Sequence, residues 1–222
     1  VNPNVLVTAK LIGVTEIYKM GGAQAIAALA FGTATVPKVE KITGPGNIFV
    51  TLAKKAVIGH VDIDMLAGPS EILIVADDSA NPTYLAADLL SQAEHDPLAC
   101  AIMITDSERV ANAVGEEIEV QLAQLPRKEI AGTSLQQAGK IILAKDMPAV
   151  IEMANLSAPE HLEIMTKAPF EIMPYIRNAG AMFLGAYSPE PLGDYYAGPN
   201  HVLPTGGTAK FYSCLLYTSP SP

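Results

Sequence analysis

Short β-forming runs alternate with helix-forming segments along most of this chain, and this alternation limits the possible fold more than any other feature. The run Glu71–Ala76 (EILIVA) is almost wholly apolar, as expected of a strand covered by helices on both faces. Similar runs follow at Ala101–Thr105, Lys140–Leu143 and Ala181–Leu184, with helical patterns between them. Such alternation predicts parallel βαβ units, and therefore an α/β fold with these four strands in one sheet.

The remaining elements are shorter or less regular. We expect further strands at Glu16–Lys19, Val39–Ile42 and His161–Met165, and helices at Gln24–Ala30, Asn47–Ile58, Pro82–Glu94, Ser107–Leu125, Arg127–Gly139, Met147–Leu156 and Pro169–Asn178. A domain boundary is expected at Ala67–Ser70, because two glycine-rich turns come before it and the long apolar strands come after it.

Composition narrows the functional classes. The 222 residues carry a formal net charge of −9, and a chain with so few basic clusters is a poor partner for nucleic acid or an anionic membrane. The two cysteines, Cys100 and Cys214, form no CxxC motif, so we expect a reducing compartment, the cytoplasm. The chain begins with Val, and its last residues (YSCLLYTSPSP) show no periodicity, so we expect a piece of a longer protein with a tail outside the fold.

Two glycine-rich turns precede predicted helices. They are Gly21-Gly22-Ala23-Gln24 and Gly44-Pro45-Gly46-Asn47. Glycine at such a turn lets a phosphate or ribose approach the backbone, and a helix N-terminus favours an anion. Neither turn is a complete dinucleotide or P-loop fingerprint, and glycine often serves packing at such turns, so both interpretations stay open.

Three histidines stand beside acids or amides in segments that proline interrupts: His95, His161 and His201. A single histidine of this kind is usually a surface residue, whereas three in such contexts favour a shared polar site. Gln92 and His95 would share one side of a helix, and Asp194 could add an oxygen, a set that suits Zn²⁺ or Mn²⁺. Glu160 and His161 place an acid beside a base, which suits proton transfer near neutral pH, although a solvated loop would look the same.

Several long, ordered stretches of the chain resemble the histidinol dehydrogenase family. They are GGAQAIAALAFGT, VPKVEKITGPGNIFV, DMLAGPSEILIVAD, AADLLSQAEHDPLA, SAPEHLEIM and IRNAGAMFLGAYSPEPLGDYYAGPNHVLPTGGTAKF. The resemblance runs from Val1 to Phe211. It implies zinc-dependent, NAD-linked, four-electron oxidation of L-histidinol to L-histidine in histidine biosynthesis. It also implies a cytoplasmic homodimer with a shared active site, and no nucleic-acid or membrane partner. Because parts of the family pattern are missing at both ends, we expect this chain alone to be inactive.

The resemblance also assigns roles to single residues. Gln92, His95 and Asp194 match zinc ligands, with a fourth ligand from the partner subunit. His161 matches the proton acceptor, and Glu160 matches the residue that activates water. The implied substrate contacts are Ser70, Gln92, His95, His161, Asp194 and His201, and the implied NAD contacts are Gln24 and Asn47.

The expected architecture is two incomplete Rossmann-like domains in three-layer αβα arrangement. Residues 1–70 would belong to an NAD-binding domain, 71–213 to the catalytic, zinc-binding domain, and 214–222 to no part of the family. Two other functions remain open: a non-catalytic metal- or nucleotide-binding module, which needs no acid–base pair, and a hydrolase that uses the same metal.

Overall fold

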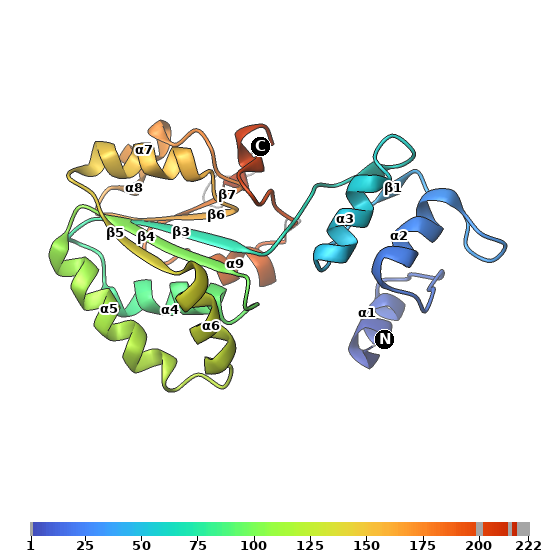
Figure 1. Cartoon of the computed structure of the whole chain (residues 1–222), viewed down its shortest axis with the longest axis horizontal. Coiled ribbons are helices and arrows are strands. Elements are labelled where there is room, and N and C mark those ends of the chain that lie inside the picture. The colour runs from blue at the N-terminus through green and yellow to red at the C-terminus, as the bar shows by residue number, and fades with distance from the viewer. Residues whose placement is uncertain (1, 199–201, 213–214, 217–222) are drawn as a thin grey trace. The chain divides into compact units, whose positions relative to one another are not determined.

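The structure is a computed structural model that describes all residues except 1, 199–201, 213–214 and 217–222 (Figure 1). The chain forms two compact units, Val1–Leu66 and Ala67–Pro222. The division falls at the start of the Ala67–Ser70 segment. Each unit has its own sheet and its own buried core.

The described part of the second unit contains a parallel sheet of six strands. Their spatial order is β5 (Lys140–Leu143), β4 (Cys100–Thr105), β3 (Glu71–Ala76), β6 (His161–Met165), β7 (Ala181–Leu184) and β8 (Leu215–Leu216). In chain order this is the 3-2-1-4-5-6 arrangement of dinucleotide-binding α/β domains, with the reversal between β3 and β6. The predicted α/β class, with its four apolar strands in one sheet, is confirmed.

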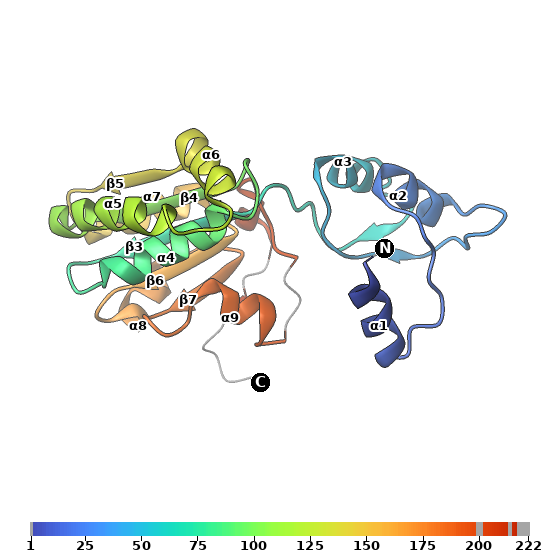
Figure 2. The ribbon, with the colours of Figure 1, turned by 90° about the horizontal axis from the view of Figure 1, so that it is seen from below.

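Helices cover both faces of this sheet, which makes three layers (Figures 1 and 2). One face carries α4 (Pro82–Ala93), α5 (Glu108–Leu122), α6 (Lys128–Ala138) and α9 (Glu190–Tyr195), and the other carries α7 (Met147–Ser157) and α8 (Pro169–Ile172). Alternate residues of β3 pack into two different hydrophobic cores, one on each face of the sheet. Ile72 and Ile74 pack with α4 and α5, whereas Leu73 and Val75 pack with α7. Because both sides of β3 are buried, its sequence is apolar throughout.

The first unit is smaller. It contains α1 (Pro3–Leu11), α2 (Gly22–Phe31), β1 (Lys41–Ile42), α3 (Ile48–Ala56) and β2 (Asp62–Ile63). Strands β1 and β2 pair in parallel, with α3 as the connection between them. Its core is formed by Ile26, Ala30, Ile42, Val57 and Val61.

Several expected elements differ from the structure. Glu16–Lys19 is irregular, because no strand of the described chain lies beside it to complete a ladder. The helix expected over Pro169–Asn178 ends at Ile172 and continues as the 3₁₀ turn Met173–Tyr175, since Pro174 has no N–H to donate. The structure also contains α1, β2, α9 and β8, which the patterns did not predict. Among the described residues, no helix combines the length and apolar composition needed to span a bilayer.

Candidate active site at the amino ends of the strands

Glu160 and His161 lie where the chain enters β6. Helix α7 ends at Ser157, and Ala158 then adopts a left-handed conformation with φ of 49°. A residue with a Cβ pays about 1–2 kcal/mol for this conformation. Ala158 is fully buried, so the surrounding packing holds the strained turn. The turn sends the chain directly into β6 with Glu160 and His161 at its amino end.

The backbone of Glu71, the first residue of β3, binds both side chains. Its N–H donates to Glu160 Oε2 over 2.9 Å. Its carbonyl oxygen lies 2.9 Å from His161 Nδ1. A carbonyl can only accept, so Nδ1 carries the hydrogen, and in the neutral ring Nε2 is the basic atom. Glu71 therefore sets both the position of the carboxylate and the tautomer of the imidazole.

A second carboxylate faces the other nitrogen of the ring. Glu190, the first residue of α9, places Oε1 3.8 Å from His161 Nε2, whereas Glu160 Oε2 lies 3.7 Å from Nδ1. The exposed fractions are 5% for Glu160, 3% for His161 and 8% for Glu190. The buried imidazole of His161 therefore has a carboxylate oxygen within 4 Å of each of its two ring nitrogens.

Two further acids lie behind this group. Glu163, two residues along β6 from His161, accepts the backbone N–H of Glu190 at Oε1 over 2.9 Å. Asp88 on α4 approaches the Glu163 carboxyl. Burial raises the pKa of Glu163 well above its usual value, and burial also raises the pKa of Asp88 to about 6. Glu163 therefore joins β6 to the start of α9, and thus to Glu190.

The expected zinc ligands lie on α4, in the turn that follows it, and on α9. Gln92 is 4% exposed, and its Oε1 has no hydrogen-bond donor among the described residues. Helix α4 ends at Ala93, so His95 is exposed in the turn beyond it rather than on the helix as predicted. Asp194 belongs to α9, but its side chain lies outside the described structure. Three or more His, Cys, Asp or Glu side chains do not gather into a metal-binding group within the described part of the chain.

Of the two remaining substrate contacts that we expected, one lies at the amino end of β3 and the other lies outside the described residues. Ser70 is half-buried directly before Glu71, and His201 lies outside the described residues. Behind Glu160, Gly180 has no room for a side chain. A Cβ there would lie 2.6 Å from the Glu160 carbonyl oxygen and 2.9 Å from Cδ of Pro204. The 202–205 segment is thus packed tightly against the strand that carries the site.

A cavity of about 270 Å³ opens beside Glu71. It is lined by Glu71, Ile72, Leu73, Cys100, Ile102, Ser157, Pro159, Gly206 and Gly207. The Glu71 carboxylate accepts the Gly206 N–H over 2.9 Å, and burial raises the pKa of this carboxyl. Burial likewise raises the pKa of the Cys100 thiol, which disfavours a reactive thiolate.

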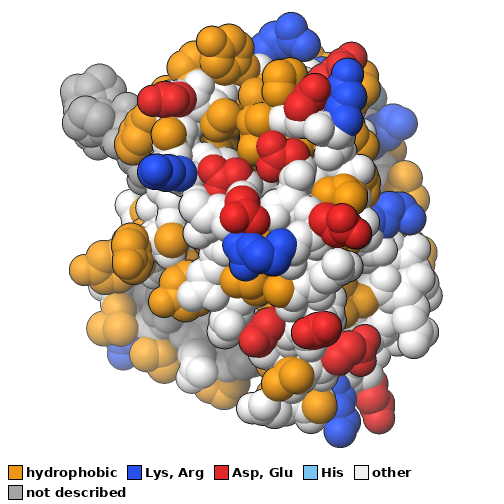
Figure 3. All heavy atoms as spheres, turned by 90° about the vertical axis from the view of Figure 1, so that its left-hand side faces the viewer, with side chains coloured by type: hydrophobic (Ala, Val, Ile, Leu, Met, Phe, Trp, Pro, Cys, Tyr) orange, Lys and Arg blue, Asp and Glu red, His pale blue; other side chains and the backbone are white. Residues whose placement is uncertain are grey.

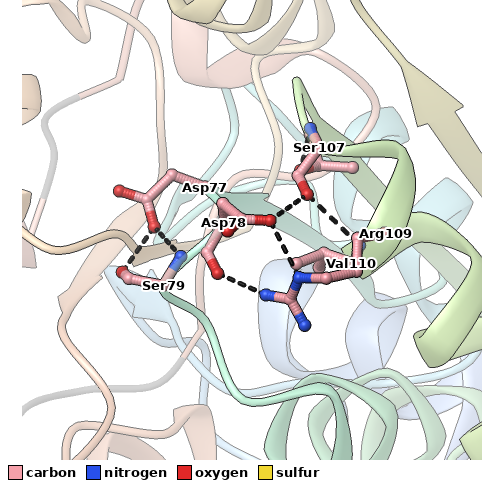
Figure 4. A network of polar contacts seen from close by, with 7 residues as sticks. Asp77, Asp78, Ser79, Ser107, Arg109 and Val110 are labelled. Atoms are coloured by element: carbon pink, nitrogen blue, oxygen red, sulfur yellow. Dashed lines mark hydrogen bonds and ion pairs between the residues drawn. The ribbon is translucent and has the colours of Figure 1, made fainter.

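The opposite edge of the sheet is built differently. Open α/β sheets usually bind ligands at the carboxyl ends of their strands. Here Asp78, after β3, accepts hydrogen bonds from Ser107 Oγ over 2.6 Å and from Arg109 Nε over 3.0 Å (Figure 4). These bonds lower the pKa of Asp78. The face that contains this end intermixes acidic and basic side chains (Figure 3). The loop between β3 and α4 is therefore hydrogen-bonded to the start of α5, and it contains no glycine that could receive a phosphate.

Most residues of the two glycine turns of the first unit are exposed, whereas Gly22 and Gly44 are half-buried. Asn47 Oδ1 caps α3 by accepting from Phe49 N over 3.1 Å and from Val50 N over 3.2 Å. Gln24 lies in the first turn of α2. Since no strand forms at Glu16–Lys19, the turn at Gly21 is not the strand-to-helix turn that we expected.

Comparison with known proteins decides the family. The sequence profile described as histidinol dehydrogenase matches residues 1–219, a range that enters the 214–222 segment. The chain belongs to the histidinol dehydrogenase family. The histidinol dehydrogenase of Clostridium acetobutylicum is 61% identical over 215 residues, which are 97% of this chain and 50% of that protein. The chain thus spans about half the length of the curated relatives that it matches.

Solved structures give the same result. The crystal structure of histidinol dehydrogenase from Elizabethkingia anophelis matches with a TM-score of 0.91 and 47% identity, over 96% of this chain and 49% of that one. A propionaldehyde dehydrogenase from Clostridium phytofermentans matches with a TM-score of 0.56 and 13% identity, over 94% of this chain and 60% of that one. At that identity the second likeness concerns the fold alone.

Sequence reasoning missed three acids of this site. Glu163 carried a usable signal, because it is a charged residue inside the predicted strand His161–Met165. Glu71 acts through its backbone atoms, which no residue pattern reveals. Glu190 reaches His161 only because α9 packs beside β6.

Proposed function

We propose that this chain carries much of the active site of an enzyme that oxidises L-histidinol to L-histidine in histidine biosynthesis, with zinc and NAD. One observation carries the proposal: Glu160 and His161 are buried side by side, and the Glu71 backbone binds both. Such an orientation suits a positioned acid–base pair and is not needed by a module that only binds. Membership of the family supports the substrate.

His161 is the proton acceptor in both oxidations. Each step removes one hydride and one proton from the substrate, first from the alcohol and then from the hydrated aldehyde. The Nδ1 hydrogen is bound to the Glu71 carbonyl, so the proton moves to Nε2. Glu190 then stabilises the imidazolium that forms.

Glu160 serves the step between the two oxidations. Water must add to the aldehyde carbon before the second hydride can leave. The Glu160 carboxylate takes a proton from that water, and the hydrogen bond from the Glu71 N–H keeps this carboxylate in position.

The chain has groups that fit both cofactors. The buried Gln92 Oε1 accepts no hydrogen bond from the described residues, which suits an oxygen that binds a cation. Gln92, His95 and Asp194 would hold the zinc. The zinc would supply a positive charge that orients the substrate, and NAD would supply the acceptor for the two hydrides. Ser70 and His201 would contact the substrate.

The exposed turn at Gly46 and Asn47, together with Gln24, would contact NAD. Residues 1–70 would then form the NAD-binding part, and 71–213 the zinc-binding catalytic part. We further propose a cytoplasmic homodimer whose subunits share each site.

A chimera tests the function. Residues 1–219 replace the matching region of the Clostridium acetobutylicum relative, and histidinol-dependent reduction of NAD⁺ is followed by absorbance. We expect turnover, and a loss of about 10²–10⁴-fold in the His161→Asn variant, the usual contribution of a general base. The exposed His60→Asn variant is the matched control. A folded chimera that does not turn over, or a His161→Asn chimera that keeps its rate, would contradict the proposal.

A further inference from the structure

The first unit contains a buried ion pair that the reaction described above does not use. Lys54 of α3 pairs with Asp64, which follows β2, and their side chains are only 4% and 5% exposed. The pair Lys41–Asp62, on the neighbouring strands, is 56% and 67% exposed. Burying two charges costs more than their attraction returns unless further hydrogen bonds satisfy them.

Two of those further hydrogen bonds go to the same residue, Gly44. Lys54 Nζ donates to the Gly44 carbonyl oxygen over 2.9 Å, and Asp64 Oδ2 accepts the Gly44 N–H over 2.7 Å. Asp64 Oδ1 also accepts the Met65 N–H over 2.7 Å. The ion pair therefore binds both polar groups of Gly44. With φ of 117°, Gly44 has a backbone conformation that a residue with a side chain rarely adopts.

The rest of the turn is fixed from its other side. A Cβ on Gly46 would lie 2.4 Å from Val50 Cγ1, so only glycine fits there. Asn47 caps the helix that carries Lys54. The Gly44–Asn47 turn is thus held at its first residue by charges and at its last by the helix cap.

We propose that Lys54 and Asp64 are positioning residues that hold the Gly44–Asn47 turn in the shape that receives the dinucleotide. This inference rests on the proposed NAD site. The ion pair hydrogen-bonds the backbone of Gly44 and would not contact the cofactor itself. Its loss would therefore change cofactor affinity through the shape of the turn. Buried ion pairs are often replaceable by apolar side chains without loss of stability, and this separates positioning from folding.

The test uses the whole 222-residue chain and the double variant Lys54→Met/Asp64→Leu, which buries no unpaired charge. The same two changes in the exposed pair, Lys41→Met/Asp62→Leu, are the matched control. NAD⁺ affinity is measured by calorimetric titration, and NMR reports the amides of Gly44, Gly46 and Asn47 and the core methyl groups of the unit. We expect core signals to persist, the amide signals of the turn to move, and the dissociation constant for NAD⁺ to rise about tenfold or more.

Each result decides between the proposals. If the unaltered chain binds NAD⁺ and the double variant binds it equally well, the positioning inference is overturned while the cofactor site stands. If the unaltered chain does not bind NAD⁺, the cofactor site itself is wrong, and the inference falls with it. Loss of the core signals in the double variant would show that the pair serves folding, which would also overturn positioning. The single variant Lys54→Arg keeps a charge and donors opposite Asp64, and under this account it retains more affinity than Lys54→Met.

Discussion

Replacing Asp88 by Asn should stabilise the protein at neutral pH. Burial beside Glu163 raises the pKa of Asp88 from 3.8 to about 6, so the folded chain binds this proton more tightly than the unfolded chain. The associated stability is complete below about pH 4 and is lost as the pH rises through about 6. The full shift corresponds to about 3 kcal/mol, and since Asp88 is only half-buried we expect about 1–2 kcal/mol of relief.

Urea denaturation of both proteins between pH 4 and pH 8 measures this effect. The gain of Asp88→Asn over the unaltered chain should grow across this range and nearly vanish at its acid end. Asp106→Asn, which removes an exposed carboxyl, should show no such trend. A gain that is equal at all pH values, or a variant less stable at neutral pH, would refute the buried acid pair as its cause.

Three further variants test packing and helix capping in the second unit by urea denaturation. Gly180→Ala should destabilise the protein by about 2 kcal/mol or more, because its Cβ would meet the Glu160 carbonyl oxygen at 2.6 Å; an unchanged midpoint would contradict this close approach. Gly115→Ala is its counterpart, with open space inside α5, and should stabilise by about 0.5–1 kcal/mol. Ser107→Ala removes both the cap of α5 and the bond to Asp78, and should cost about 1–2 kcal/mol; a loss below a few tenths would show that water replaces the cap.

Strands β3, β4, β6 and β7 were predictable because helices on both faces of the sheet bury most of their residues, whereas the edge strand β5 is mostly exposed and was predicted from its short apolar run alone. Glu71–Ala76, Lys140–Leu143, His161–Met165 and Ala181–Leu184 were predicted with the bounds that the structure shows. Glu16–Lys19 was wrong, since a β-forming run becomes a strand only where a partner strand exists. A ladder partner is a tertiary feature, and a sequence pattern does not contain it.

The candidate site was visible only in part. Adjacent Glu160 and His161 stood out in the sequence, and the structure buries them together. The contacts with Glu71 and Glu190 come from residues 90 positions before His161 and 29 after it, brought near by strand pairing and by α9. The roles assigned to Gln92, His95, Asp194, Ser70, His201, Gln24 and Asn47 remain predictions.

The most direct test of the central claim separates the two oxidations in the Glu160→Gln chimera. Rates are measured with histidinol and, separately, with the corresponding aldehyde, while released products are quantified. The account predicts that the first oxidation largely persists, that the second slows by about 10²–10⁴-fold, and that aldehyde accumulates, because only the second oxidation needs activated water. Equal slowing of both oxidations, or no slowing of either, would contradict the role of Glu160.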